Sequence, residues 1–87
     1  MKYTVIWKPS ARRELAEIWN DASDRQAVAD AANEIDRRLA VDPEHEGESR
    51  ESGFRVIFIT RLAASYHVSL SDRLVSVLRI WSVKRNG

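Results

Sequence analysis

The sequence predicts an α+β fold in the order β-α-α-β-β-β, with an antiparallel meander sheet and a helical hairpin packed on one face. Three observations predict this fold. Apolar residues recur at helical spacing in the first half of the chain, and they alternate at strand spacing in the second half. Between the halves lies a charged segment, residues 42–52, without an apolar side chain. With 87 residues in total, we expect one domain spanning 1–87.

The first strand and the first helix are predicted from residues 2–21. Residues 2–8 are rich in aromatic and β-branched types and stop at Pro9, which is typical of a strand. Ser10 stands at the expected N-cap of a helix over 11–21. The apolar positions with helical spacing are Ala11, Leu15, Ile18, Trp19 and Ala22. We expect Trp19 to anchor the core from this helix.

The second helix is predicted from about residue 24 to Val41. Ser23 and Gln26 form a capping box at its start, and Asp42-Pro43 ends it. Its narrow apolar stripe comprises Val28, Ala31, Ala32, Ile35 and Leu39. Glu34 and Arg38 are expected to pair on its outer side. Because only two or three residues separate the two helices, they must fold back as a hairpin.

Three strands are predicted in the second half. Residues 54–59 are apolar on most of both faces, which favours a central strand. After a turn within 60–65, a strand alternates strictly, and Asp72-Arg73 then turns the chain into a last strand over 74–81. Helices that cover the sides of Phe54 and Tyr66 would leave Arg55 and His67 together on the open face of the sheet. We expect Tyr66 and Trp81 to be buried under the helices.

The composition excludes several classes of protein. The chain has no cysteine, which removes disulfide scaffolds, zinc ribbons and thiol nucleophiles. Its three glycines are too scattered for a phosphate-binding loop. No apolar run reaches the roughly 18–20 residues of a membrane span, and the N-terminus does not resemble a secretory signal. We therefore expect a cytoplasmic protein without a membrane partner, a metal or another cofactor.

Charge is distributed unevenly along the chain, although its net charge is only +1. Residues 1–52 hold eight Lys and Arg against twelve Asp and Glu, whereas residues 53–87 hold six Lys and Arg against Asp72 alone. Such asymmetry indicates an anionic partner if the basic half forms one surface, because phosphate contacts supply most non-specific nucleic-acid affinity. The alternative is that acidic residues simply favour the helical half.

Several segments in this order resemble the RelE/ParE superfamily of bacterial toxins from type II toxin-antitoxin systems. The resemblance covers nearly the whole chain. It rests on the opening run 5–15 (VIWKPSARREL), the end of the second helix at 35–39 (IDRRL) with Asp42-Pro43, the segments 47–50 (GESR) and 53–56 (GFRV), and the final run 72–80 (DRLVSVLRI). The resemblance implies a cognate antitoxin protein as partner, and it leaves the oligomeric state open.

Two mechanisms are implied by this resemblance. RelE-like members cut mRNA on the ribosome without a metal, whereas ParE-like members inhibit DNA gyrase. Many members carry a C-terminal tyrosine, which is missing from residues 81–87 here, and this difference favours gyrase inhibition through the helical hairpin. His67 and the basic second half favour ribosome-dependent RNA cleavage, which is the mechanism that we expect, with gyrase inhibition as the alternative. A third alternative is an inactive relative that retains antitoxin binding.

The candidate site residues follow the RNA-cleaving alternative. Metal-free cleavage needs an acid and a base together with fixed positive charge at the phosphate. An imidazole suits acid-base work, and guanidinium groups bind phosphate as permanently charged forks. The catalytic candidates are Arg55, His67 and Lys84. The nucleic-acid-binding candidates are Arg50, Arg61, Arg73, Arg79 and Arg85. Arg79 has the alternative of lying at the edge of the core.

Overall fold

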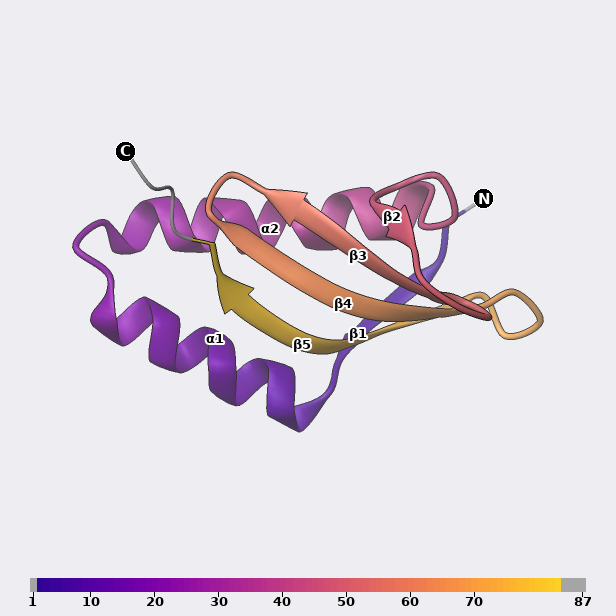
Figure 1. Cartoon of the computed structure of the whole chain (residues 1–87), viewed down its shortest axis with the longest axis horizontal. Helices are drawn as coiled ribbons and strands as arrows, with labels where there is room; N and C mark the ends of the chain where they lie inside the picture. Colours follow the sequence, from indigo (N-terminus) through magenta and orange to yellow (C-terminus); the bar gives the residue numbers. More distant parts are fainter. Residues whose placement is uncertain (1, 84–87) are drawn as a thin grey trace.

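Two helices and five strands make up the computed structural model, which describes residues 2–83 (Figure 1). The helices are α1 (Pro9–Asp21) and α2 (Arg25–Val41). The strands are β1 (Thr4–Trp7), β2 (Glu48–Ser49), β3 (Phe54–Ile59), β4 (Leu62–Ser69) and β5 (Leu74–Ser82). The α+β class is confirmed, and the short β2 in the charged segment was not predicted.

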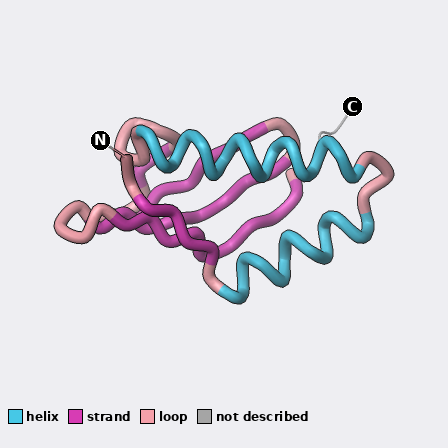
Figure 2. Tube along the Cα trace, turned by 180° about the vertical axis from the view of Figure 1, so that it is seen from behind, coloured by secondary structure: helices cyan, strands magenta, loops and turns pink. Residues whose placement is uncertain are grey.

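A single mixed sheet has the strand order β1-β5-β4-β3-β2. The predicted antiparallel meander is present as β3, β4 and β5, while β1 adds to β5 in parallel register. In Figure 1 the sheet lies in front of α2, and from behind, in Figure 2, α2 crosses in front of the strands. One face of the sheet is therefore covered by helix, and we call the other side the open face.

The starts of both helices differ from the predicted caps. Helix α1 begins at Pro9, whose fixed φ suits the first turn, and Lys8 is its N-cap. Ser10 lies inside the helix, where its hydroxyl donates to the carbonyl of Leu78 at 2.8 Å. At α2 the capping side chain is Asp24, which accepts from the Ala27 amide at 3.1 Å. Aspartate caps a helix as well as serine does, and the observed cap lies one residue after the predicted Ser23.

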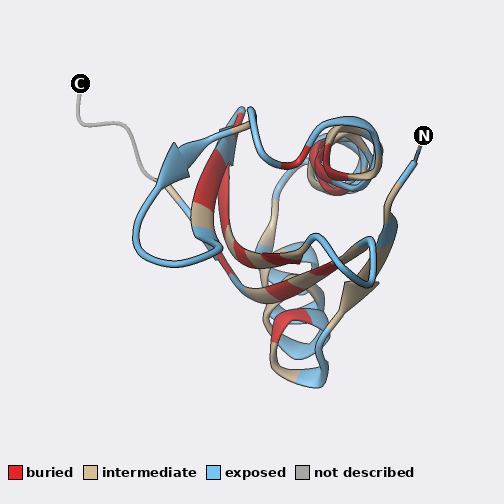
Figure 3. Cartoon of the chain, turned by 90° about the vertical axis from the view of Figure 1, so that its right-hand side faces the viewer, coloured by how far each residue is buried: buried red, intermediate tan, exposed pale blue. Residues whose placement is uncertain are grey.

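The core lies between the sheet and the helices (Figure 3). Its fully buried side chains include Ile35 and Leu39 from α2 and Tyr66 from β4. Strand β3 contributes Ile57 and Ile59, whereas Phe54 and Phe58 lie on the open face and are 42% and 51% exposed. The expected inward side of β3 is therefore wrong, while the expected burial of Tyr66 is confirmed.

The register of the β3–β4 hairpin explains this reversal. Its loop is only Thr60-Arg61, and Ile59 pairs directly with Leu62. Directly paired residues share a face, so the inward Leu62 places Ile59 and Ile57 inward as well. The predicted turn over 60–65 was too long and gave no such constraint.

Two tryptophans were also expected in the core, and the structure places both at the surface. Trp19 near the end of α1 is 42% exposed, and Trp81 in β5 is 41% exposed. Trp81 pairs with Ala63 on the side of the sheet opposite the helices.

Among the residues described, no helix is long and apolar enough to cross a membrane.

Candidate functional site

Arg55 and His67 lie on opposite faces of the sheet. In the β3–β4 register Arg55 pairs with Tyr66, which is buried beneath the helices, and His67 pairs with Phe54 on the open face. The expectation that both side chains share the open face is wrong. The sheet therefore does not assemble the predicted pair of an imidazole and a guanidinium around one phosphate.

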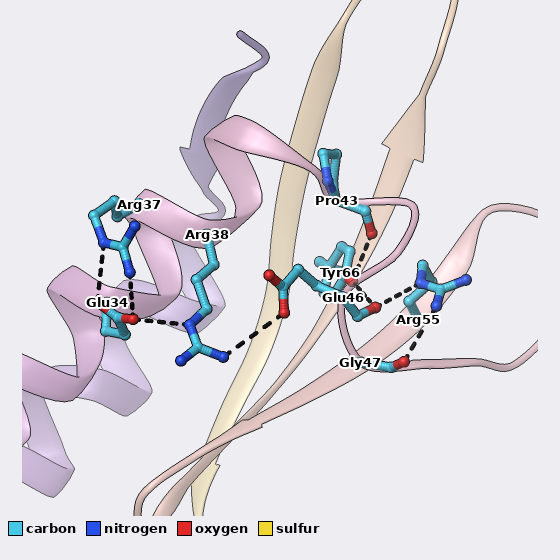
Figure 4. A network of polar contacts seen from close by, with 8 residues as sticks. All are labelled: Glu34, Arg37, Arg38, Pro43, Glu46, Gly47, Arg55 and Tyr66. Atoms are coloured by element: carbon cyan, nitrogen blue, oxygen red, sulfur yellow. Dashed lines mark hydrogen bonds and ion pairs between the residues drawn. The ribbon is translucent and has the colours of Figure 1, made fainter.

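The guanidinium of Arg55 is occupied by the backbone of the neighbouring loop (Figure 4). Its Nε donates to the carbonyl oxygen of Glu46 at 2.8 Å, and its Nη2 donates to that of Gly47 at 3.2 Å. Gly47 has a φ of 64° and approaches β3 so closely that a Cβ there would lie 2.1 Å from the carbonyl oxygen of Val56. Arg55 thus fastens the loop before β2 to the sheet.

Tyr66 completes the same network from the core. Its hydroxyl lies 2.8 Å from the carbonyl oxygen of Pro43 and 2.7 Å from that of Glu46. Burial raises the pKa of the Tyr66 phenol, so it remains a neutral donor at neutral pH. Arg55 and Tyr66 therefore satisfy backbone carbonyls of one loop from the covered side of the sheet.

His67 sits among different neighbours. Its ring centroid lies 4.7 Å from that of Phe54, with the planes tilted by 57°. A Cβ on Gly53 would come within 2.9 Å of its Nε2, so this glycine leaves the space that the imidazole fills. The surroundings of His67 on the open face are thus aromatic and backbone groups.

Of the other predicted residues, those within 2–83 do not form one basic surface. Arg50 pairs with Glu48 at 3.1 Å, and Arg79 pairs with Glu14 of α1 at 2.6 Å. The guanidinium carbon of Arg73 lies 5.3 Å from the centre of the Tyr3 ring. Arg61 lies in the β3–β4 turn and makes no ion pair within residues 2–83. The remaining candidates, Lys84 and Arg85, lie outside the described residues.

Glu14 ties α1 to the exposed edge of β5. Its carboxylate accepts from Arg79 and, at 3.1 Å, from the backbone amide of Ile80. The hydrogen bond from Arg79 lowers the pKa of Glu14. The alternative expectation for Arg79, a position at the core edge, comes nearer to the structure than a role on an open basic face, although its side chain is 65% exposed.

Two surface features were missed from the sequence. The open face carries the exposed rings of Phe54, Phe58 and Trp81. At the end of the helical hairpin, the Arg25 guanidinium lies 4.6 Å from the centre of the Trp19 ring and donates to the carbonyls of Trp19 and Asn20, each at 3.2 Å. The signal for the second feature was available, because Trp19 lies two residues before the end of α1, where little core remains to cover it.

A hollow opens between the first two turns of α1 and the middle of α2, beside β1. Its volume is about 240 Å³, and it is lined by Trp7, Arg12, Leu15, Ala32, Asn33 and Asp36. The indole nitrogen of Trp7 donates to Asp36 across it at 3.1 Å. The hairpin thus combines an exposed tryptophan with a hollow large enough for one side chain of a partner.

The fold and these surfaces define a small α+β protein with a helical hairpin on one face of its sheet and exposed aromatic side chains on the other. Residues 5–87 match the family described as ParE toxin of type II toxin-antitoxin system, parDE, and the chain belongs to this family. The resemblance to the RelE/ParE superfamily is thereby confirmed. A comparison with curated proteins finds no significant match.

Solved structures share the fold. The RelBE2 toxin-antitoxin complex from Mycobacterium tuberculosis contains a chain with a TM-score of 0.76 and 22% identity, covering 94% of this chain and 99% of that one. A chain of the chromosomal ParDE system from P. aeruginosa gives 0.75 and 20%, covering 94% and 97%. The isolated E. coli RelE toxin gives 0.60 and 15%, covering 97% and 87%.

Proposed function

We propose that the chain is a toxin that inhibits DNA gyrase by binding it through the helical hairpin, without cutting RNA. The observation that carries this proposal is the separation of Arg55 and His67 by the sheet, since the cleavage centre predicted from these two residues needs both groups at one phosphate. Membership of the ParE family supports it. Lys84 lies outside the described residues and adds no argument for either mechanism.

The hairpin offers the features of a protein-binding surface. Trp19 is 42% exposed, and Arg25 holds its ring from one side. Tryptophan and arginine are the residue types most enriched among those that dominate binding energy. The same hairpin also contains the hollow between α1 and α2, which offers a second place for a partner side chain.

We also propose that a cognate antitoxin protein neutralises the chain in the cytoplasm, and that the pair contributes to plasmid stabilization. Two of the similar structures come from toxin-antitoxin systems, RelBE2 and ParDE, which supports a protein partner here. Ribosome-dependent mRNA cleavage is the alternative mechanism, and the same experiment addresses it.

The test is expression of the chain in cells while plasmid supercoiling and mRNA 5′ ends are followed. We expect loss of negative supercoiling or DNA breakage with intact mRNA. Trp19→Ala should abolish the effect, whereas Leu70→Ala, which removes an even more exposed apolar side chain outside the hairpin, should retain it. Codon-phased mRNA cuts that disappear in His67→Ala would establish the endoribonuclease instead, and growth without arrest would indicate an inactive relative.

A further inference from the structure

The outer edge of β5 is covered by another strand over less than half of its length. Strand β5 has nine residues, but β1 pairs only with residues 74–77. We call residues 78–82 the outer segment of β5, and no strand of the described part of the chain lies beside its outer edge. Unpaired backbone groups at a sheet edge can pair with a strand of another molecule.

The outer segment has little protection in its own sequence. It reads LRIWS, without a proline or a glycine, and three of its five side chains are large and apolar. Arg79 is its one charged residue. Natural edge strands are commonly protected by several charges or by proline, and a short apolar strand without them is prone to pair between molecules.

Helix α1 lies beside this segment (Figures 1 and 2). Two of its side chains bind backbone groups of the strand. The hydroxyl of Ser10 donates to the carbonyl oxygen of Leu78 at 2.8 Å, and the carboxylate of Glu14 accepts from the amide of Ile80 at 3.1 Å. These are one acceptor and one donor of the kind that a neighbouring strand would bind.

The spacing of the two side chains matches the spacing of the two backbone groups. Ser10 and Glu14 are four residues apart, which is a rise of about 6 Å along a helix. Leu78 and Ile80 are two residues apart, which is about 6.7 Å along a strand. Ala11, one turn before Glu14, is fully buried, so a small side chain lies where α1 is in contact with the core.

Arg79 orients the carboxylate of Glu14. Its Nε donates to Oε2 at 2.8 Å, while the other oxygen, Oε1, accepts from the Ile80 amide. Both carboxylate oxygens are therefore occupied, one by the side chain and one by the backbone of the same strand. The Glu14 side chain is 25% exposed, whereas that of Arg79 is 65% exposed.

We propose that Ser10 and Glu14 protect the outer segment of β5 from strand pairing with another copy of this chain. The two side chains take the place of the strand that β1 is too short to provide, and Arg79 is a positioning residue for Glu14. Another copy is the relevant competitor because two identical edges can pair antiparallel about a two-fold axis, each satisfying the other.

Hydrogen exchange of the Ile80 amide in the purified full-length chain, followed by NMR, tests the contact. Glu14→Ala should raise its exchange rate at least about tenfold, while the amides of residues 74–77 keep their rates. Glu14→Gln retains an acceptor oxygen and should restore most of the protection. Glu17→Ala, on exposed surface of the same helix, is the control and should exchange like wild type. An unchanged Ile80 rate in Glu14→Ala overturns the proposal.

Sedimentation tests the consequence for association. The double variant Ser10→Ala/Glu14→Ala should have a higher mass than wild type at the same concentration. Tyr66→Phe removes a buried hydrogen bond away from this edge and should keep the wild-type mass, which separates exposure of the edge from a general loss of stability. If the double variant does not fold, Glu14→Ala alone serves for the comparison. A wild-type mass in the edge variant, or an equal increase in Tyr66→Phe, overturns the proposal.

Discussion

On the covered face of the sheet Tyr66 is fully buried and its hydroxyl has two carbonyl partners, whereas on the open face Phe58 leaves half of its surface in water. The neighbours Arg55 and His67 follow the same division. Arg55 is bonded to a loop of its own chain, and His67 lies against an exposed ring. The comparison teaches that Arg55 stabilises the fold, while the open face leaves aromatic side chains exposed to solvent.

The largest expected difference between the faces concerns their large aromatic side chains. Tyr66→Ala removes a fully buried ring and should lower the free energy of unfolding by about 3–5 kcal/mol. Phe58→Ala removes a ring that is 51% exposed and should cost about 1 kcal/mol. Urea denaturation at low protein concentration measures both. If Tyr66→Ala does not fold, Tyr66→Phe should still lose about 1 kcal/mol through its hydroxyl. Equal losses at Tyr66 and Phe58 would contradict the comparison.

The next difference concerns two arginines of neighbouring segments. Arg55→Ala leaves the carbonyls of Glu46 and Gly47 without their donor and should lower the free energy of unfolding by about 1–2 kcal/mol. Arg61→Ala, in the β3–β4 turn, should change it by no more than about 0.5 kcal/mol. Limited proteolysis within 42–49 should also become faster in Arg55→Ala alone. Unchanged stability and an unchanged rate of proteolysis in Arg55→Ala would contradict the structural role of Arg55.

The smallest expected effect concerns the contact that holds α1 at the edge of β5, and it depends on pH. The pKa of Glu14 is below its usual value of 4.5 because its carboxylate accepts a hydrogen bond from Arg79. Its stabilisation is therefore fully present above pH 4.5 and is lost as the pH falls through the lower folded-state pKa. At neutral pH, Glu14→Gln should lower the free energy of unfolding by about 1 kcal/mol.

Acid titration of stability provides the check on Glu14. The curves of wild type and Glu14→Gln should converge as the pH falls below the folded-state pKa, because the wild-type carboxylate is then protonated. Glu17→Gln, on exposed surface of the same helix, serves as the control and should parallel wild type throughout. A gap for Glu14→Gln that stays constant down to strong acid would show that its carboxylate charge does not hold α1.

The order of helices and strands was predictable because each element carries a strong period. The α2 stripe, the stop at Asp42-Pro43 and the pair of Glu34 with Arg38 at 2.8 Å all follow the prediction. The inward face of β3 was not predictable in the same way. Five of its six residues are apolar, so alternation gives no direction, and only the two-residue loop that fixes the hairpin register decides it.

The candidate site failed for a related reason. The assignment of Arg55 to the open face depended on the undetermined side of β3, and a one-residue shift of strand register exchanges the faces completely. The carbonyls that bind its guanidinium belong to Glu46 and Gly47, in a loop whose composition shows charge but no backbone geometry. The sequence singled out Arg55 as a candidate residue, but only the fold shows which atoms its guanidinium contacts.

The most direct measurement follows DNA supercoiling by purified gyrase in the presence of the purified chain, with no RNA or ribosome in the reaction. It tests whether toxicity requires catalysis by Arg55 and His67. We expect wild type and His67→Ala to inhibit the reaction at the same concentration, because the hairpin lies apart from that histidine. Absence of inhibition by wild type, combined with cleavage of ribosome-bound mRNA that His67→Ala loses, would contradict the account.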